Sequence, residues 1–282
     1  MNISMAKAYR TTSSEALCIV TGMTPIISKT EEAVKQYNIR KKKGNQTQLI
    51  DREVELKNWP HPDVVKITED NGYKEQTIQI YTDGSKNEHG VGSGVAIFVG
   101  KDLKAQLKFK LDNRCSNSQA EQLAIAKALE IIDATDIAEN SPRTIGIFTD
   151  SRITIDSLKT VNNHSYLIED IRKRMSILER TNWTIEFSWV KAHVGIYGNE
   201  LADKLTKAAA CNKDTTVSLN RIPKSTLYSE IVEEATKMAK RRGKFYEGSH
   251  NKTILPKRTG QGQTEYKLKP EFHGYGNRTR KK

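Results

Sequence analysis

The chain has 282 residues, 36% of them hydrophobic and 28% charged, which suffices for one sizeable domain with flanking segments. It contains no apolar run of about 18 residues and no charged start followed by an apolar stretch, so we expect neither a membrane span nor a secretory signal. Its three cysteines are far apart, a spacing that favours neither a disulfide framework nor a zinc site. We therefore expect an intracellular protein of the nucleus or cytoplasm that is not secreted and has no membrane partner.

The net charge of +12 is concentrated at one end of the chain. Residues 221–282 hold 16 Lys and Arg against 6 Asp and Glu, a net +10, whereas residues 1–220 hold 30 basic and 28 acidic residues. A basic tail commonly contacts phosphate backbones, but it can equally be a solvated end with no partner. The sequence leaves both interpretations open.

Four segments follow one another along the chain. Residues 1–50 are expected to be a helical flank, and residues 51–75 a polar linker. Residues 76–211 carry the periodic patterns of a folded domain. Residues 212–282 are expected to be a basic and largely flexible tail with one possible helix, at residues 225–240.

The folded domain is predicted to begin with three strands. Alternating apolar and polar residues predict a first strand that starts near residue 76 and ends at Asp83. The glycines of residues 90–94 are typical of a turn. Residues 95–99 and 105–111 then predict a buried strand and a strand with one wet face.

Helices and two further strands alternate after this point. Helices are predicted at residues 118–133, 151–158, 165–180 and 198–210, and strands at residues 144–149 and 184–190. Three consecutive strands suggest an antiparallel meander, and strands that alternate with helices join in parallel. The sequence therefore predicts an α/β fold with one mixed five-stranded sheet, three strands antiparallel and two parallel, flanked by helices.

Two aspartates stand at the ends of predicted strands. Asp83 follows Thr82 on the first strand, and Asp150 follows Thr149 on the fourth. If those strands are parallel neighbours, both carboxylates emerge at the same sheet edge, where open α/β sheets place their sites. Each aspartate taken singly is more typical of a turn or a helix N-cap.

Glu121 begins the apolar face of the predicted helix at residues 118–133. The same face carries Ala124, Ile125 and Ala128, so it is expected to pack on the sheet. A carboxylate there is costly to bury unless it is paired or bound to metal. The alternative is a partner for the helix dipole or a cap in the first turn.

The segment 192–203 supplies the last two candidates. His193 opens a loop whose two glycines permit a tight turn, and Asp203 lies in the following helix. A lone histidine is more often structural than catalytic, and a lone helix aspartate is usually solvated. Taken together, however, four carboxylates are hard oxygen ligands that suit Mg²⁺ or Mn²⁺ rather than zinc. A pair of such ions can hydrolyse a phosphodiester, so the sequence points to metal-dependent hydrolysis of a polyanion.

Four motifs of this chain resemble those of the type 1 ribonuclease H family, and they occur in the family's order. They are Thr82–Ser85, Gln119–Ala124, Thr149–Ser151 and His193–Asp203. The resemblance covers about 135 residues and implies a ribonuclease H-like fold. It implies two Mg²⁺ ions, for which Mn²⁺ substitutes, held by the catalytic carboxylates of Asp83, Glu121, Asp150 and Asp203. It also implies that His193 lies on a mobile loop and assists proton transfer or product release.

The resemblance further implies contacts with substrate from residues beside the carboxylates. They are Gly84, Ser85, Ser116, Asn117, Ser118, Gln119 and Ser151. Residues 116–119 match the polar run that contacts 2′-hydroxyl groups, the feature that distinguishes RNA from DNA. The alternative for this run is a helix N-cap made by Asn117 or Ser118.

The flanks resemble a second group of proteins. Residues 8–17 and 222–225 are similar to the segments around the ribonuclease H region of non-LTR (LINE-type) retrotransposon polyproteins, where a reverse transcriptase precedes the nuclease. This chain has no Tyr-x-Asp-Asp polymerase signature, so it would be a fragment without polymerase activity.

The sequence therefore predicts a monomeric endonuclease that hydrolyses the RNA strand of RNA–DNA hybrids. A different class of function is a catalytically silent retrotransposon remnant that binds nucleic acid through its basic tail. A third reading is an exonuclease of the same fold, but its first motif normally carries Asp-x-Glu, which Asp83-Gly84-Ser85 lacks.

Overall fold

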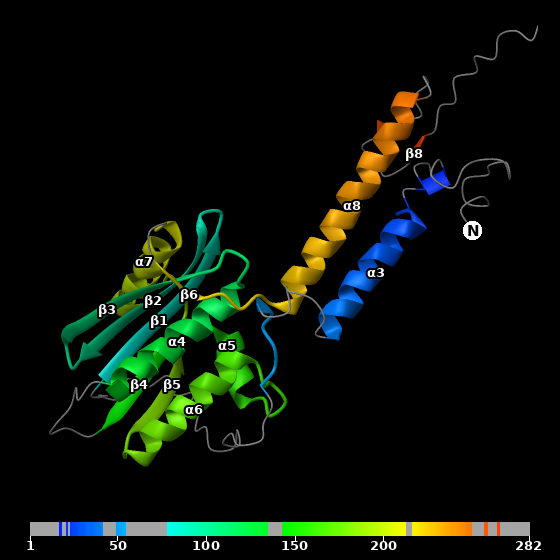
Figure 1. Ribbon diagram of the computed structural model, residues 1–282. Helices are drawn as coiled ribbons and strands as arrows, with labels where there is room; N and C mark the ends of the chain where they lie inside the picture. Colours follow the sequence, from blue (N-terminus) through cyan, green and yellow to red (C-terminus); the bar gives the residue numbers. More distant parts are fainter. Residues whose placement is uncertain are drawn as a thin grey trace, which may run out of the picture. The chain divides into compact units, whose positions relative to one another are not determined.

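The structure is a computed structural model of the full chain (Figure 1). It describes residues 17–18, 21, 23–41, 49–54, 78–134, 143–212, 216–249, 257–258 and 264–265. The chain divides into two compact units, Lys43–Tyr228 and a second made of Met1–Lys42 with Ser229–Lys282. Most of the expected linker at 51–75, the flank at 8–17 and the end of the tail lie outside the described residues.

A mixed sheet of six strands forms the centre of the larger unit (Figure 1). Its strands are β1 Ile78–Asn87, β2 Gly90–Val99, β3 Asp102–Leu111, β4 Thr144–Thr149, β5 Thr184–Trp189 and β6 Val217–Leu219. The spatial order is β5-β4-β1-β2-β3-β6. The meander β1-β2-β3 is antiparallel, and β4, β5 and β6 join in parallel. The predicted fold class is confirmed, with six strands in place of the expected five.

Two local predictions about the first hairpin were wrong. The turn lies at residues 88–89, and the glycine-rich residues 90–94 are part of β2. These glycines suit a strand here because helix α7 packs directly on the backbone of β2 at Gly94. The first strand also continues past Asp83 to Asn87, since it pairs with β2 along its whole length.

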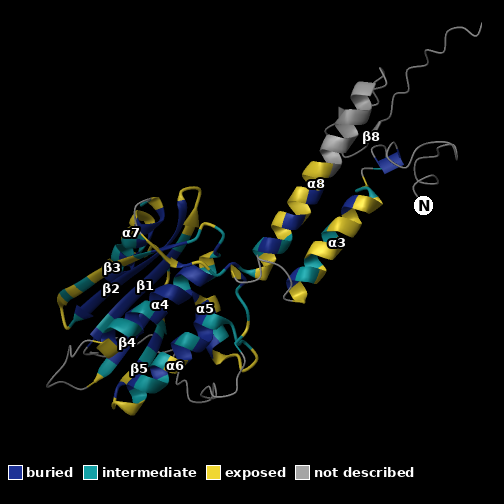
Figure 2. Ribbon diagram, in the orientation of Figure 1, coloured by how far each residue is buried: buried dark blue, intermediate teal, exposed yellow. Residues whose placement is uncertain are grey.

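Helices cover both faces of the sheet. They are α4 Asn117–Ala134, α5 Arg152–Lys159, α6 Tyr166–Arg180 and α7 Tyr197–Cys211. Alternate residues of β1 point to opposite faces, so Ile80 joins α4 and α6 in one apolar core while Tyr81 joins Ala202 of α7 in another. The central strands β1 and β2 are buried along most of their length (Figure 2). The larger core is close to fully buried, and the apolar stripe of α4 runs along it.

Segments on either side of residues 78–212 also belong to this unit. The Asp51 N–H donates to the Ile222 carbonyl at 2.8 Å, and the Ile222 N–H donates to the Leu49 carbonyl at 2.6 Å. The Val54 N–H donates to the carbonyl of His164 at 2.9 Å. Ile50 and Ile222 are each 2% exposed, so both segments are anchored by apolar burial as well as by hydrogen bonds.

The second unit contains α3 Ile26–Arg40 and most of α8 Lys224–Ser249. Lys35 of α3 and Glu234 of α8 form an ion pair at 2.5 Å. Two short strands, Lys257–Arg258 and Thr264–Glu265, pair antiparallel. Within the described part of the chain, every helix is too short or too polar to cross a bilayer.

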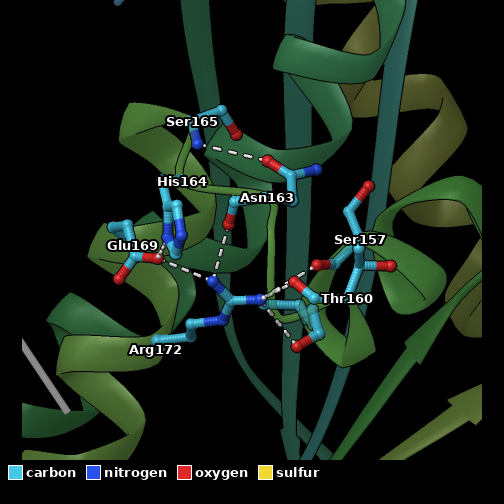
Figure 3. A network of polar contacts seen from close by, with 8 residues as sticks. Ser157, Thr160, Asn163, His164, Ser165, Glu169 and Arg172 are labelled. Carbon is cyan, nitrogen blue, oxygen red and sulfur yellow. Dashed lines mark hydrogen bonds and ion pairs between the residues drawn. The ribbon is translucent and has the colours of Figure 1, made fainter. Parts of the chain in front are cut away.

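A buried ion pair ties α5, α6 and the loop between them together (Figure 3). Arg172 and Glu169 are each 1% exposed, and Arg172 Nη1 donates to Glu169 Oε1 at 2.6 Å. The Arg172 guanidinium also donates to four backbone carbonyls, those of Ser157, Leu158, Thr160 and Asn163. The last carbonyls of a helix have no partner inside it, so this arginine closes the C-terminus of α5.

We predict that Arg172→Met destabilises the protein by about 3–5 kcal/mol, because it leaves the Glu169 charge buried without its partner. Urea unfolding followed by circular dichroism measures the change. Arg174→Met is the matched control, since Arg174 is half-buried and its pairs with Asp170 and Glu130 should contribute no more than about 1 kcal/mol. Equal losses in the two variants would contradict the role assigned to Arg172.

Candidate active site

The strand register places Asp83 and Asp150 side by side. Parallel pairing of β1 with β4 runs up to Thr82 opposite Thr149, so the two aspartates are the next residues at the same sheet edge. Asp83 is 8% exposed, and Asp150 is half-buried. The indole N–H of Trp189, at the end of β5, donates to the Asp150 carbonyl at 3.0 Å and holds the backbone there.

Glu121 is brought to the same edge by the close approach of α4 to β1. Gly84 lies against the α4 backbone at Ala120 and Glu121, where a Cβ atom would collide with main-chain atoms. Glycine is therefore required at this position for steric reasons. The Ser151 hydroxyl donates to Glu121 Oε2, and Asn117 Nδ2 donates to Glu121 Oε1 at 2.8 Å.

Asp203 reaches the site from α7, on the other face of the sheet. The Thr206 hydroxyl, one turn along α7, donates to the Asp83 carbonyl at 3.0 Å and ties that helix to β1. Lys207 forms an ion pair with Asp203 at 2.7 Å. Sequence reasoning missed Lys207, although its i,i+4 spacing from Asp203 is the spacing of helical ion pairs.

Burial, together with repulsion between neighbouring carboxylates, perturbs three acidic side chains of this site. Burial, and then the negative charges of Asp150, Asp203 and Glu121, raise the pKa of Asp83 from 3.8 to about 7. Burial also raises the pKa of Glu121 and of Asp150, and the charge of Asp150 adds to the shift at Glu121. The four carboxylates predicted from the sequence therefore lie within electrostatic range of one another.

The donor set fits a hard divalent cation, because all four side chains are carboxylates whose charges repel one another. Among the described residues, however, no group of three or more His, Cys, Asp or Glu side chains is arranged so that it could hold a metal ion. Glu121 is instead satisfied by Ser151 and Asn117, and Asp203 by Lys207.

His193 lies on the exposed loop before α7. Its backbone is in the left-handed region with φ 55°, and Gly195 follows with φ 84°. Burial raises the pKa of Asp150, and the proximity of His193 offsets part of this rise, so the imidazole lies within electrostatic range of that carboxylate.

The predicted substrate residues fall into two groups. Asn117 is exposed and Ser85, Ser116 and Ser118 are half-buried, so all four can be approached from outside. The other three have structural contacts inside the protein. Gly84 allows the backbone of α4 to approach β1, and Ser151 caps α5 and donates a hydrogen bond to Glu121. Gln119 is buried, with 4% of its surface exposed.

The start of α4 is capped by Ser116, and neither Asn117 nor Ser118 is the cap. The Gln119 N–H donates to the Ser116 hydroxyl at 3.2 Å, and the Ser116 N–H donates to Gln119 Oε1 at 2.9 Å. This reciprocal pair is a capping box, and its Ser-x-x-Gln spacing is visible in the sequence.

A mixed sheet flanked by helices, with acidic side chains gathered at one edge, is consistent with the ribonuclease H-like class of α/β folds. The RNase H family model matches residues 75–211. Ribonuclease H of Ruthia magnifica subsp. Calyptogena magnifica is 33% identical over 147 residues, which cover 47% of this chain and 94% of that protein. This chain belongs to the ribonuclease H family.

Two further relatives come from a mammal and from a virus. Ribonuclease H1 of Rattus norvegicus is 25% identical over 147 residues, 49% of this chain and 52% of that protein. The Pol polyprotein of equine infectious anemia virus (strain Wyoming) is 34% identical over 137 residues, 46% of this chain and 10% of the polyprotein. The family match ends before β6 and begins after residues 49–54.

We predict that the metal-free protein loses stability as pH rises from about 4 to about 7, and that Asp83→Asn removes the largest part of this loss. Native Asp83 keeps a proton that the unfolded chain releases at its ordinary pKa of 3.8, so stability falls until the native pKa of about 7 is passed. One pKa unit corresponds to about 1.4 kcal/mol. The variant should therefore exceed the wild type by roughly 2–4 kcal/mol near pH 8.

Urea unfolding with a chelator, at about pH 5 and about pH 8, measures this difference. Asp102→Asn, which changes an exposed carboxylate of β3, is the control and should follow the wild type at both pH values. A wild-type stability that does not fall between the two pH values would contradict the prediction.

Proposed function

We propose that this chain hydrolyses the RNA strand of RNA–DNA hybrids at internal positions, using two divalent metal ions, Mg²⁺ or Mn²⁺. The observation that carries the proposal is the convergence of four carboxylates from β1, α4, α7 and the end of β4, with the pKa of Asp83 raised to about 7. Such a cluster is costly until cations neutralise it. Family membership, and relatives named ribonuclease H and ribonuclease H1, support the substrate class.

Asp83, Glu121, Asp150 and Asp203 would hold the ions, which supply an activated water and stabilise the leaving oxygen of the phosphodiester. The protein's other residues contribute by positioning these carboxylates. Ser151 and Asn117 keep Glu121 oriented, and the Trp189 indole fixes the backbone at Asp150. His193, exposed on its loop beside Asp150, is suited to move a proton to or from the reacting phosphodiester.

Recognition of RNA is assigned to the exposed start of α4. Asn117 and Ser118 present an amide and a hydroxyl next to Glu121, and such groups can hydrogen-bond a 2′-hydroxyl. Gln119 is excluded from direct contact by its burial and by its hydrogen bonds inside the protein. Its part in recognition is therefore indirect.

The relation to retroelements is a further part of the proposal. The match to a viral Pol polyprotein lends it limited support, because that match covers only 10% of the polyprotein and 46% of this chain. A silent nucleic-acid-binding fragment would bind hybrid through its basic residues without cutting it. The presence of the full carboxylate set favours an active enzyme.

The deciding experiment is Mg²⁺-dependent cleavage of end-labelled RNA–DNA hybrid, compared with duplex RNA, duplex DNA and single strands. We predict internal cuts in the RNA of the hybrid alone, and loss of more than about nine-tenths of the activity in Asp83→Asn and Asp150→Asn. Asp156→Asn is the control, because Asp156 is an exposed carboxylate of α5 outside the cluster. Binding of hybrid without any cleavage would support the silent fragment, and stepwise shortening from one end would support an exonuclease.

His193→Ala should slow turnover by about 10²–10⁴-fold without abolishing it, because ions held by the four carboxylates would supply the main charge stabilisation. The rate is measured under single-turnover and multiple-turnover conditions across about pH 6 to 9. A variant with the wild-type rate throughout would make the loop histidine a structural residue.

A further inference from the structure

A residue outside the family match contacts the first turn of α4. Asp51 lies on the segment 49–54, and its Oδ2 accepts a hydrogen bond from Gln119 Nε2 at 2.7 Å. The same Gln119 nitrogen donates to the Arg221 carbonyl at 2.9 Å, on the segment that follows β6. Gln119 therefore links two flanking segments to the helix that carries Glu121.

These bonds determine which way the Gln119 amide faces. Its oxygen receives the Ser116 N–H in the capping box, so its nitrogen must find acceptors on the opposite side. Asp51 and the Arg221 carbonyl are those acceptors. Without the Asp51 carboxylate, the buried Gln119 nitrogen loses its charged acceptor, and only the Arg221 carbonyl is left to hold the side chain that completes the capping box.

Hydrogen bonds and a cation–π contact fix the two flanking segments, residues 49–54 and 217–222, which together form an anchor for α4. Asp51 and Ile222 are joined by a backbone hydrogen bond, and the Arg221 guanidinium lies 3.7 Å from the ring centroid of Tyr166 at the start of α6. The buried Cys115 thiol donates to the Arg221 carbonyl at 3.4 Å. The anchor thus meets the nuclease body at α4, at α6 and at the loop before α4.

We propose that Asp51 is a positioning residue that acts through Gln119 to hold the first turn of α4, and with it Asn117 and Glu121. It follows that the working nuclease includes residues 49–54 and 217–222, which lie outside the match at 75–211. The effect on cleavage rests on the proposed function, whereas the positioning itself can be measured without any activity.

The test compares Asp51→Ala, Asp51→Asn and the wild type in the full chain. Asp51→Asn keeps an acceptor oxygen for Gln119 and Asp51→Ala does not. Asp51→Asn should therefore retain the slow exchange and the kcat/KM of the wild type, which Asp51→Ala should lose. Asp170→Ala is the matched control, because it also removes a half-buried carboxylate, one that pairs with Arg174 on its own helix α6 and not with the first turn of α4. The rate of amide hydrogen exchange in residues 112–121 measures how firmly the first turn of α4 is held. The values of kcat and KM on hybrid measure the effect on cleavage.

In Asp51→Ala, exchange in residues 112–121 should be about tenfold faster, and kcat/KM for hybrid should fall at least about tenfold, mainly through KM. Asp51→Asn and Asp170→Ala should stay within about threefold of the wild type. Adding Asp51→Ala to Gln119→Met should change neither measurement further, since both variants remove the same hydrogen bond. If Asp51→Ala does not fold, Gln119→Glu should show the faster exchange, because it keeps an oxygen for the Ser116 N–H but loses the donor to Asp51.

Three results would overturn the proposal: unchanged exchange in Asp51→Ala, failure of Asn to rescue, or an equal loss in Asp170→Ala. A wild-type protein that binds hybrid without cutting it would refute the proposed function instead. The exchange measurement would still decide whether Asp51 positions α4.

Discussion

Burial of one carboxylate beside three like charges is the constraint on which the rest of the structure depends. Asp83 is 8% exposed, and three other acidic side chains act on it from α4, α7 and the end of β4. Its pKa of about 7 measures the cost of keeping it ionised without cations. Groups shifted in this way by burial and by like charges are characteristic of functional sites.

The protein offsets part of this cost with its own donors. Ser151 and Asn117 bond Glu121, and Lys207 pairs with Asp203, so hydrogen bonds and one ammonium group stabilise two of the carboxylates. The Lys207 pair is exposed at its nitrogen and therefore weak. The pKa of Asp83 is raised to about 7 in spite of these contacts, so the cluster as a whole is only partly compensated.

Segments on both sides of the family match are part of the folded nuclease unit. β6 extends the sheet beside β3, and Ile50 pairs with Ile222 in a buried bridge. A truncation after residue 211 would remove β6 and the Arg221 carbonyl on which Gln119 depends. Any test of the basic residues further along the chain must therefore leave residues 217–228 in place.

The sequence by itself determined the fold class, the order of the elements and the four acidic candidates, because periodicity and motif spacing are local properties of the chain. It did not reveal that Gly84 and Gly94 serve close helix packing, since a glycine in a strand looks the same as one in a turn until its neighbour is known. Nor could it show that Gln119 faces Asp51, 68 positions earlier, and not a substrate. Only the tertiary structure decided these points, because the direction of a side chain depends on partners that the folded backbone brings from distant parts of the sequence.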